Sequence, residues 1–247
     1  MADGDAGQLQ VGLLGPLSVR RGGRNLDLGP VRRQAVLVAL VLRAGHRVTH
    51  EDLLDDIWGD HPPSTGVRVL PSHVYALRQT LETEAVQRAG VIRSGKGWYS
   101  FDDQETRLDT EELAARSGRA HETRASAGPA AALALFGEAL ALFRGEPLAG
   151  LPGRYTNSVR RQLQEQWHTL RRGRLECLVL LGRSAEALEE LAELTASRPL
   201  DEGLLALQIR VLSTSGRQAE ALDAFHGLRG RLREEHGAEP GEELRGL

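Results

Sequence analysis

The sequence predicts a mainly α protein in two parts, an α+β domain with small β-sheets followed by an all-α domain of helical repeats. Three observations support this fold class. Short alternating apolar runs open the chain, helix-period segments and two further strand-like runs follow, and one heptapeptide pattern recurs 34 residues later in the second half. With 247 residues, 40% hydrophobic and 26% charged, the chain is long enough for two domains that each bury a core.

Composition and charge argue against a membrane-spanning or secreted protein. No run approaches the roughly 18 apolar residues of a membrane span, and the polar, acidic residues 1–8 are expected to be a disordered tail rather than a secretion signal. We therefore expect a cytoplasmic protein without membrane contact. Cys177, the single cysteine, lies in an apolar run and is expected in the core. The net charge of −3 divides into +2 over residues 1–101 and −5 over residues 102–247, which permits one basic face on the first domain.

The first domain is expected to cover residues 9–101 and to begin with a small sheet. Three short runs between residues 9 and 28 alternate apolar and polar side chains and are separated by Gly-Pro and Gly-Gly, as in antiparallel strands joined by turns. A largely buried helix is predicted over residues 30–44, and it stops at Gly45.

Two more helices follow in the first domain. Thr49 is placed to cap a second helix whose acidic first turn suits the positive end of the helix dipole. The third helix has a buried stripe at spacings of 4, 3 and 4, formed by Leu70, Val74, Leu77 and Leu81. Pro71 is tolerated only in a first turn, so the regular helix should begin around Val69 to Leu70.

The third helix and the segment after it predict a DNA-binding fold. Its side chains that fall largely off the stripe are polar, with one arginine and no acid: Ser72, His73, Tyr75, Arg78 and Gln79. Such a face suits the major groove of DNA. Residues 91–94 and 98–101, joined by residues 95–97, predict a hairpin with a basic tip. Three helices and a hairpin in this order are typical of a winged helix-turn-helix.

Two other kinds of site in the first domain, a phosphate-binding loop and a metal site, are disfavoured. Residues 90–96 match the first seven positions of a phosphate-binding loop, but Gly97 stands where serine or threonine is needed and a strand follows. His46 and His50 are four residues apart, yet a helix boundary separates them and no third ligand lies near in sequence. We predict no catalytic residue, no metal site and no cofactor, so the chain is not expected to be an enzyme.

The second half repeats itself with the period of tetratricopeptide helix pairs. Gly182–Leu188 recurs as Gly216–Leu222, and each copy opens an amphipathic helix. A third helix is expected between them over residues 204–212, with further helices over residues 131–143 and 159–181. We expect a linker at 102–108 and a helical-repeat domain at 109–247. Stacked repeats offer extended surfaces for protein partners, although the helices could also pack only against one another and the first domain.

Taken in order, these pieces resemble the Streptomyces antibiotic regulatory protein family, in which a winged helix precedes a bacterial transcriptional activator domain. The resemblance runs from end to end. The segments that carry it are Leu14–Leu17, Arg32–Ala35, Leu53–Gly59, His73–Arg78, Gly97–Tyr99, Ala139–Gly145, Gly216–Leu222 and Glu239–Gly241.

The resemblance implies a pathway-specific activator of antibiotic and other secondary-metabolite genes. It would bind tandem direct repeats of double-stranded DNA near promoters as side-by-side protomers, a homodimer on DNA, and recruit RNA polymerase holoenzyme in the nucleoid. Larger relatives add a nucleotide-hydrolysing domain after the helical one. This chain ends at Leu247, so we expect no ATP dependence.

The resemblance also implies roles for individual residues. The side chains expected to read base edges are Ser72, His73, Tyr75 and Arg78. Those expected at the DNA backbone or in the wing are Arg32, Arg33, Thr65, Arg68, Arg93, Lys96 and Trp98. The family commonly has an arginine where this chain has Ala76. The alternative hypothesis is a helical-repeat adaptor whose DNA-binding domain is degenerate, which the thin basic content of residues 1–101 supports.

Overall fold

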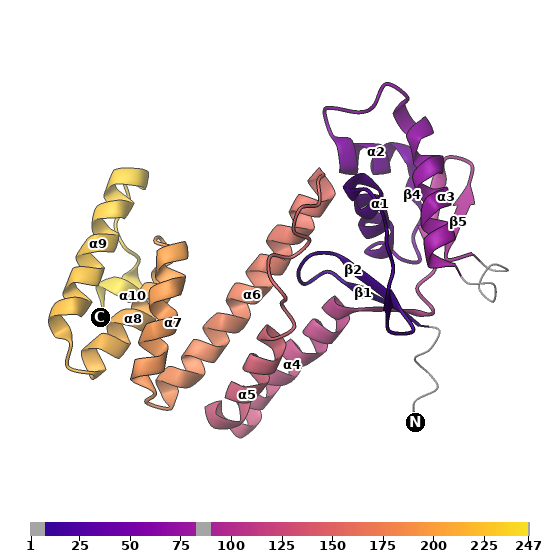
Figure 1. Cartoon of the computed structure of the whole chain (residues 1–247). Coiled ribbons are helices and arrows are strands. Elements are labelled where there is room, and N and C mark those ends of the chain that lie inside the picture. Colours follow the sequence, from indigo (N-terminus) through magenta and orange to yellow (C-terminus); the bar gives the residue numbers. More distant parts are fainter. Residues whose placement is uncertain (1–7, 83–89, 247) are drawn as a thin grey trace. The chain divides into compact units, whose positions relative to one another are not determined.

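A computed structural model describes residues 8–82 and 90–246 (Figure 1). The chain divides into two compact units. The first unit takes in the chain up to residue 115 together with residues 141–167, and the second takes in residues 116–140 and 168–247. The tail expected at residues 1–8 lies, apart from Gln8, outside the described residues. The domain boundaries expected from the sequence stay a prediction.

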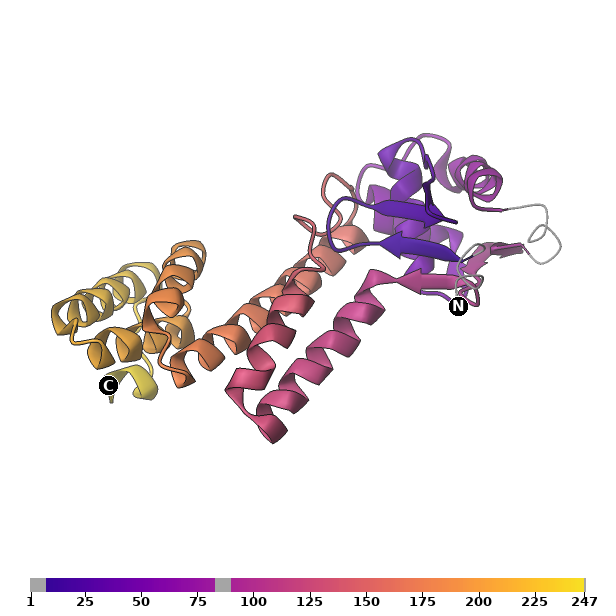
Figure 2. The ribbon, with the colours of Figure 1, turned by 60° about the horizontal axis from the view of Figure 1, so that its bottom comes forward.

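A four-stranded sheet opens the first unit, and the alternating runs predict its first three strands. Its strands are β1 (Leu9–Gly12), β2 (Ser18–Arg21), β3 (Arg24–Asn25) and β7 (Thr106–Leu108), in the order β3-β2-β1-β7. The strands β1 and β2, drawn in indigo, lie side by side in Figure 2 and pair antiparallel. Strand β7 pairs parallel with β1 and lies inside the segment expected to be a linker.

Three helices follow in the predicted order. They are α1 (Val31–Val41), α2 (His50–Trp58) and α3 (Leu70–Leu81), the last preceded by a 3-10 turn, η1 (Gly66–Val69). Thr49 caps α2, its hydroxyl accepting from the amide of Asp52 at 3.1 Å. The predicted stripe of α3 is fully buried, and Pro71 lies in its first turn. These expectations are confirmed.

The predicted hairpin is the second sheet of the unit. Strands β5 (Ile92–Gly95) and β6 (Trp98–Phe101) pair antiparallel, and the short strand β4 (Val48–Thr49) pairs with the other side of β6. Gly97 closes the turn at φ +80°, a conformation that favours glycine. The segment weighed as a phosphate-binding loop is therefore strand and turn, without the helix start that such a loop needs.

Residues 141–167 return to complete the first unit. The amides of Arg144 and Leu148 donate to the carbonyls of Leu14 and Gly15, both at 2.7 Å. The carboxylate of Asp109 accepts from the amide of Leu13 at 2.8 Å, which ties the start of α4 (Asp109–Ala127) to the same loop. Local sequence patterns do not predict these contacts, because each contact joins residues more than 90 positions apart.

The second unit is all helix, as predicted. It contains the later parts of α4 and α6 (Arg154–Leu180) together with α5 (Pro129–Leu140), α7 (Ser184–Ser197), α8 (Glu202–Thr214), α9 (Gln218–His236) and α10 (Glu242–Arg245). The two copies of the repeat begin α7 and α9, and α8 lies between them in the chain, as expected. Cys177 is fully buried, and burial raises the pKa of its thiol.

Among the helices that the structure describes, α4 is a long helix that the sequence pattern did not predict. Its buried hydrophobic residues are Leu113 and Ala120, too few to form a recognisable stripe over 19 residues. Among the described residues, no helix combines the length and the apolar character needed to cross a membrane.

Candidate nucleic-acid interface

The exposed face of α3 carries uncharged hydrogen-bonding groups. Ser72, Tyr75 and Gln79 are exposed, and their spacing of three and four residues puts them on one side of the helix. Tyr75 is 65% exposed, which is unusual for so large an aromatic side chain. The hydroxyl of Ser72 donates to the carbonyl of Val69 at 2.7 Å, so its oxygen keeps its capacity to accept. This face can meet the donors and acceptors of base edges.

Two other side chains expected in the groove, His73 and Arg78, are half-buried. The ring of His73 lies against Trp58 of α2, with 5.9 Å between ring centroids and a tilt of 40°. Burial, and then the nearby charge of Arg33, lowers the pKa of His73. The imidazole is therefore neutral near pH 7, and one ring nitrogen can accept a hydrogen bond while the other donates.

The side chain of Arg78 turns toward the wing. Its Nε and Nη2 atoms donate to the carbonyl oxygen of Ile92 in β5, at 3.0 and 2.7 Å. The sequence placed Arg78 correctly off the buried stripe, but the helical period carries no information on where so long a side chain ends.

The wing presents positive charge at its turn and along one edge. Lys96 is exposed in the turn, and the exposed Arg93 is paired with Asp102. The guanidinium of Arg47 lies over the half-buried ring of Trp98, 4.6 Å from its centroid. An added Cβ at Gly95 would come within 2.3 Å of that ring, which explains the glycine there.

Sequence reasoning missed Arg47. No apolar period or motif surrounds it, and the signal that could have found it is strand register. Thr49 stands opposite Trp98 in the β4–β6 pair, so a side chain two residues before Thr49 is a diagonal neighbour of Trp98 on the same face. The stacked guanidinium is exposed and available to a phosphate.

The remaining side chains expected at the DNA backbone fall into two groups. Thr65 and Arg68 are exposed just before α3, and the Nε of Arg68 donates to the carbonyl of Thr65 at 3.3 Å. Arg32 and Arg33 are half-buried and bind their own domain: Arg32 donates to the carbonyl of Ile57 at 2.5 Å and lies over Trp58. Arg33 donates to the carbonyl of Leu28 at 3.4 Å.

Three acids in and just after α2, namely Asp55, Asp56 and Asp60, are paired with arginines of the same unit. Asp55 and Asp60 accept from Arg154, at 3.4 and 2.7 Å. Asp56 is paired with Arg43, and burial raises its pKa while the hydrogen bond and charge of Arg43 lower it. These carboxylates, which would repel a phosphate backbone if unpaired, are thus partly neutralised.

The histidines weighed as metal ligands lie in different settings. His46 is exposed, whereas the ring of His50 stacks on Tyr99 with 4.7 Å between centroids. Within residues 8–82 and 90–246, no three His, Cys, Asp or Glu side chains gather closely enough to hold a metal ion.

Two family profiles match the chain, in the order of its two predicted domains. The profile for the C-terminal domain of transcriptional regulatory proteins matches residues 23–97, and the profile for the bacterial transcriptional activator domain matches residues 108–247.

Individual relatives match almost the whole chain. The regulatory protein DnrI of Streptomyces peucetius is 33% identical over 97% of this chain and 90% of its own length. The regulatory protein AfsR of Streptomyces griseus is 35% identical over 97% of this chain, which spans only 24% of that relative. Among solved structures, Mycobacterium tuberculosis EmbR in complex with a low affinity phosphopeptide matches with a TM-score of 0.83 and 25% identity, covering 97% of this chain and 63% of that one.

Proposed function

The chain belongs to the Streptomyces antibiotic regulatory protein family of transcriptional regulators, and we propose that it activates genes of a secondary-metabolite pathway by binding tandem direct repeats of duplex DNA. Helix α3 enters the major groove, and the wing contacts the flanking backbone. Two protomers bind side by side on the two repeats and recruit RNA polymerase holoenzyme. Such a regulator acts in the cytoplasm, on the nucleoid.

The observation that carries the proposal is the pairing of an uncharged polar face on α3 with a basic hairpin in the same unit. Ser72, Tyr75 and Gln79 supply hydrogen bonds and apolar contact to base edges, and the neutral His73 borders them. Phosphate contacts come from exposed side chains around this face. They are Arg47, Thr65, Arg68, Arg93 and Lys96.

The helical unit is proposed to contact the polymerase. The support is its architecture, because stacked helix pairs present extended surfaces to protein partners, and its match to the transcriptional activator domain. The first unit sets the spacing of the two protomers, because the two half-sites lie one helical turn of the duplex apart.

Selection of randomised duplex DNA by the purified chain, followed by sequencing, tests the proposal. We expect enrichment of two direct repeats separated by about one helical turn, 10–10.5 base pairs from centre to centre. On the selected duplex, Gln79→Ala should lose about 1–3 kcal/mol of discrimination at one base pair, the cost of a bidentate contact to adenine.

The adaptor hypothesis predicts a different result. A folded chain that enriches no sequence over the input, yet forms a stable complex with another protein, would mean that α3 does not read DNA. A circular dichroism melt of the same preparation provides the folding control. If the chain bound all duplexes with one affinity, the result would support the phosphate contacts and contradict the proposed reading of bases by α3.

A further inference from the structure

We infer that Arg78 is a positioning residue that fastens the wing to the recognition helix α3, rather than a residue that reads a base. The part of this inference that concerns DNA rests on the proposed function. The part that concerns the wing can be tested on the free protein.

The contact of Arg78 lies at the open edge of the wing sheet. The sheet has the order β4-β6-β5, so β5 is an edge strand. The carbonyl of Val91 accepts from the amide of Asp102 and therefore points toward β6. Because successive carbonyls of a strand point in opposite directions, the carbonyl of Ile92 points away from β6. Within residues 8–82 and 90–246, the donors to this edge carbonyl are the Nε and Nη2 atoms of Arg78.

Both partners are withdrawn from solvent. Ile92 is buried, and the side chain of Arg78 is half-buried. A partly buried carbonyl without a donor loses its water contacts without compensation, and a hydrogen bond from a charged donor is stronger than one from a neutral donor. For Arg78 to reach a base, it would have to release both hydrogen bonds and uncover the carbonyl of Ile92.

A second strand of the wing also lies near Arg78. Burial raises the pKa of Tyr99 in β6, and the positive charge of Arg78 opposes that rise. Tyr99 itself is buried and stacks on His50 at the start of α2. Arg78 thus joins the last turn of the recognition helix to the hairpin through hydrogen bonds, in addition to the chain connection between them.

The consequence for DNA binding is indirect. The wing carries Lys96 in its turn and the Arg47 guanidinium on Trp98, the groups proposed to meet phosphates. If Arg78 sets the angle between α3 and the wing, its loss misplaces these groups. Affinity for every duplex then falls together, while discrimination between sequences is kept, because the exposed face of α3 is unchanged.

A double-mutant cycle between Arg78→Ala and Lys96→Ala tests this coupling. Affinities are measured against salt concentration on the selected duplex and on a random duplex. In the wild-type background we expect Lys96→Ala to flatten the salt slope by about one, the effect of one lost phosphate contact. In the Arg78→Ala background the same change should flatten the slope by much less, since Lys96 is already misplaced.

The two roles of Arg78 give opposite results in the cycle. A positioning role predicts that Arg78→Ala lowers affinity for both duplexes by the same factor and that the two changes are not additive. A base-reading role predicts a loss confined to the selected duplex and additive effects, which would overturn the inference. Arg68→Ala is the matched control, because this exposed arginine should weaken both duplexes while remaining additive with Lys96→Ala.

Hydrogen exchange of the free protein gives a readout that needs no DNA. Arg78→Ala should speed exchange in a peptide covering residues 91–101 without changing exchange in α1. Arg78→Lys should restore part of the protection, because an ammonium can donate to one carbonyl, and it replaces the alanine variant if that variant does not fold. Unchanged exchange in the wing would overturn the inference. If the wild-type chain retains no duplex, the proposed function fails and this comparison alone decides the role of Arg78.

Discussion

The two copies of the helical repeat have nearly the same local structure and different surroundings. The second residue of each copy is an arginine that binds a glutamate three residues later through two hydrogen bonds of 2.6 Å, Arg183 with Glu186 and Arg217 with Glu220. Each buries an alanine at the next turn, Ala187 and Ala221. The leucine that ends the shared motif, however, packs onto a buried cluster in the first copy and is 59% exposed in the second, at Leu222.

The difference separates the local structure, which the repeat sequence determines, from the burial of side chains, which depends on the neighbouring helices. The first copy lies between α6 on one side and the cluster formed by α8 and α9 on the other. Leu188 packs against that cluster, and Glu190 is only 8% exposed beneath the arginines of α6. The equivalent position in the second copy is Ala224. The shared motif therefore specifies the start of the helix and its arginine–glutamate pair, while the neighbouring helices determine how far the following residues are buried.

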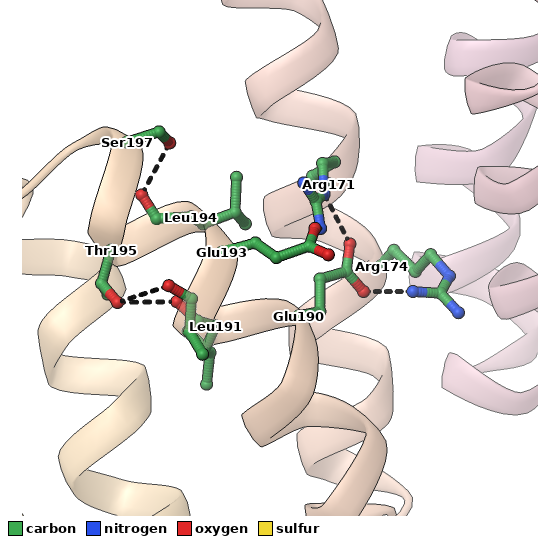
Figure 3. A network of polar contacts seen from close by, with 9 residues as sticks. Arg171, Arg174, Glu190, Leu191, Glu193, Leu194, Thr195 and Ser197 are labelled. Atoms are coloured by element: carbon green, nitrogen blue, oxygen red, sulfur yellow. Dashed lines mark hydrogen bonds and ion pairs between the residues drawn. The ribbon is translucent and has the colours of Figure 1, made fainter.

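The largest effect is expected where the first copy differs most from the second, at Glu190. Its carboxylate accepts from Arg171 Nε at 2.9 Å and from Arg174, so it joins α7 to α6 (Figure 3). Glu190→Ala should lower the free energy of unfolding by about 3 kcal/mol, because it removes a buried carboxylate that accepts hydrogen bonds from two partly buried guanidinium groups. Urea denaturation of the whole chain measures this loss.

Glu193 is the matched control for that measurement. It also binds Arg171, at 2.9 Å, but it is 73% exposed. Glu193→Ala should change stability by no more than about 1 kcal/mol, as for other exposed ion pairs. Equal losses of unfolding free energy for Glu190→Ala and Glu193→Ala would show that burial does not make the Glu190 ion pairs stronger. The two copies of the repeat would then differ only in the packing of their apolar side chains.

A smaller difference is expected between the two leucines. Leu188→Ala removes a partly buried side chain from the α8–α9 cluster and should cost about 1–2 kcal/mol. Leu222→Ala removes an exposed side chain and should stay within about 0.5 kcal/mol of the wild type. A clear loss at Leu222 would mean that α9 is covered in solution, and sedimentation of both variants would reveal whether a second copy covers it.

The same distinction explains how much of the molecule could be predicted from its sequence. Sequence patterns were sufficient to predict the buried stripe of α3, the cap at Thr49 and both copies of the repeat. They were insufficient for β7 and for the return of residues 141–167 to the first unit. Those features depend on partners that are distant in the chain, and a three-residue strand has no period of its own.

The candidate DNA interface likewise contains features that the sequence predicts and features that only the structure shows. Helical period placed Ser72, Tyr75 and Arg78 off the buried stripe, and two of them are exposed as predicted. The end of a long side chain is set by the nearest acceptor, so the contact of Arg78 with Ile92 could be found only from the structure. Arg47 required the register of β4 against β6, which two residues of sequence do not specify.

The smallest effect is expected where the two copies are alike, at their arginine–glutamate pairs. The hydrogen bond from Arg217 lowers the pKa of Glu220, so this contact stabilises the folded state above the unfolded pKa of 4.5 and is lost as pH falls through the folded value. Because both groups are exposed, Glu220→Gln and Glu186→Gln should shift the melting temperature slightly and equally, and added salt should reduce both shifts. Thermal melts at pH 7 measure both shifts, and melts at decreasing pH should show the shift for Glu220→Gln shrinking as pH falls through the folded pKa of Glu220. A larger shift for Glu186→Gln would mean that position in the stack affects even the residues at the surface of the repeat.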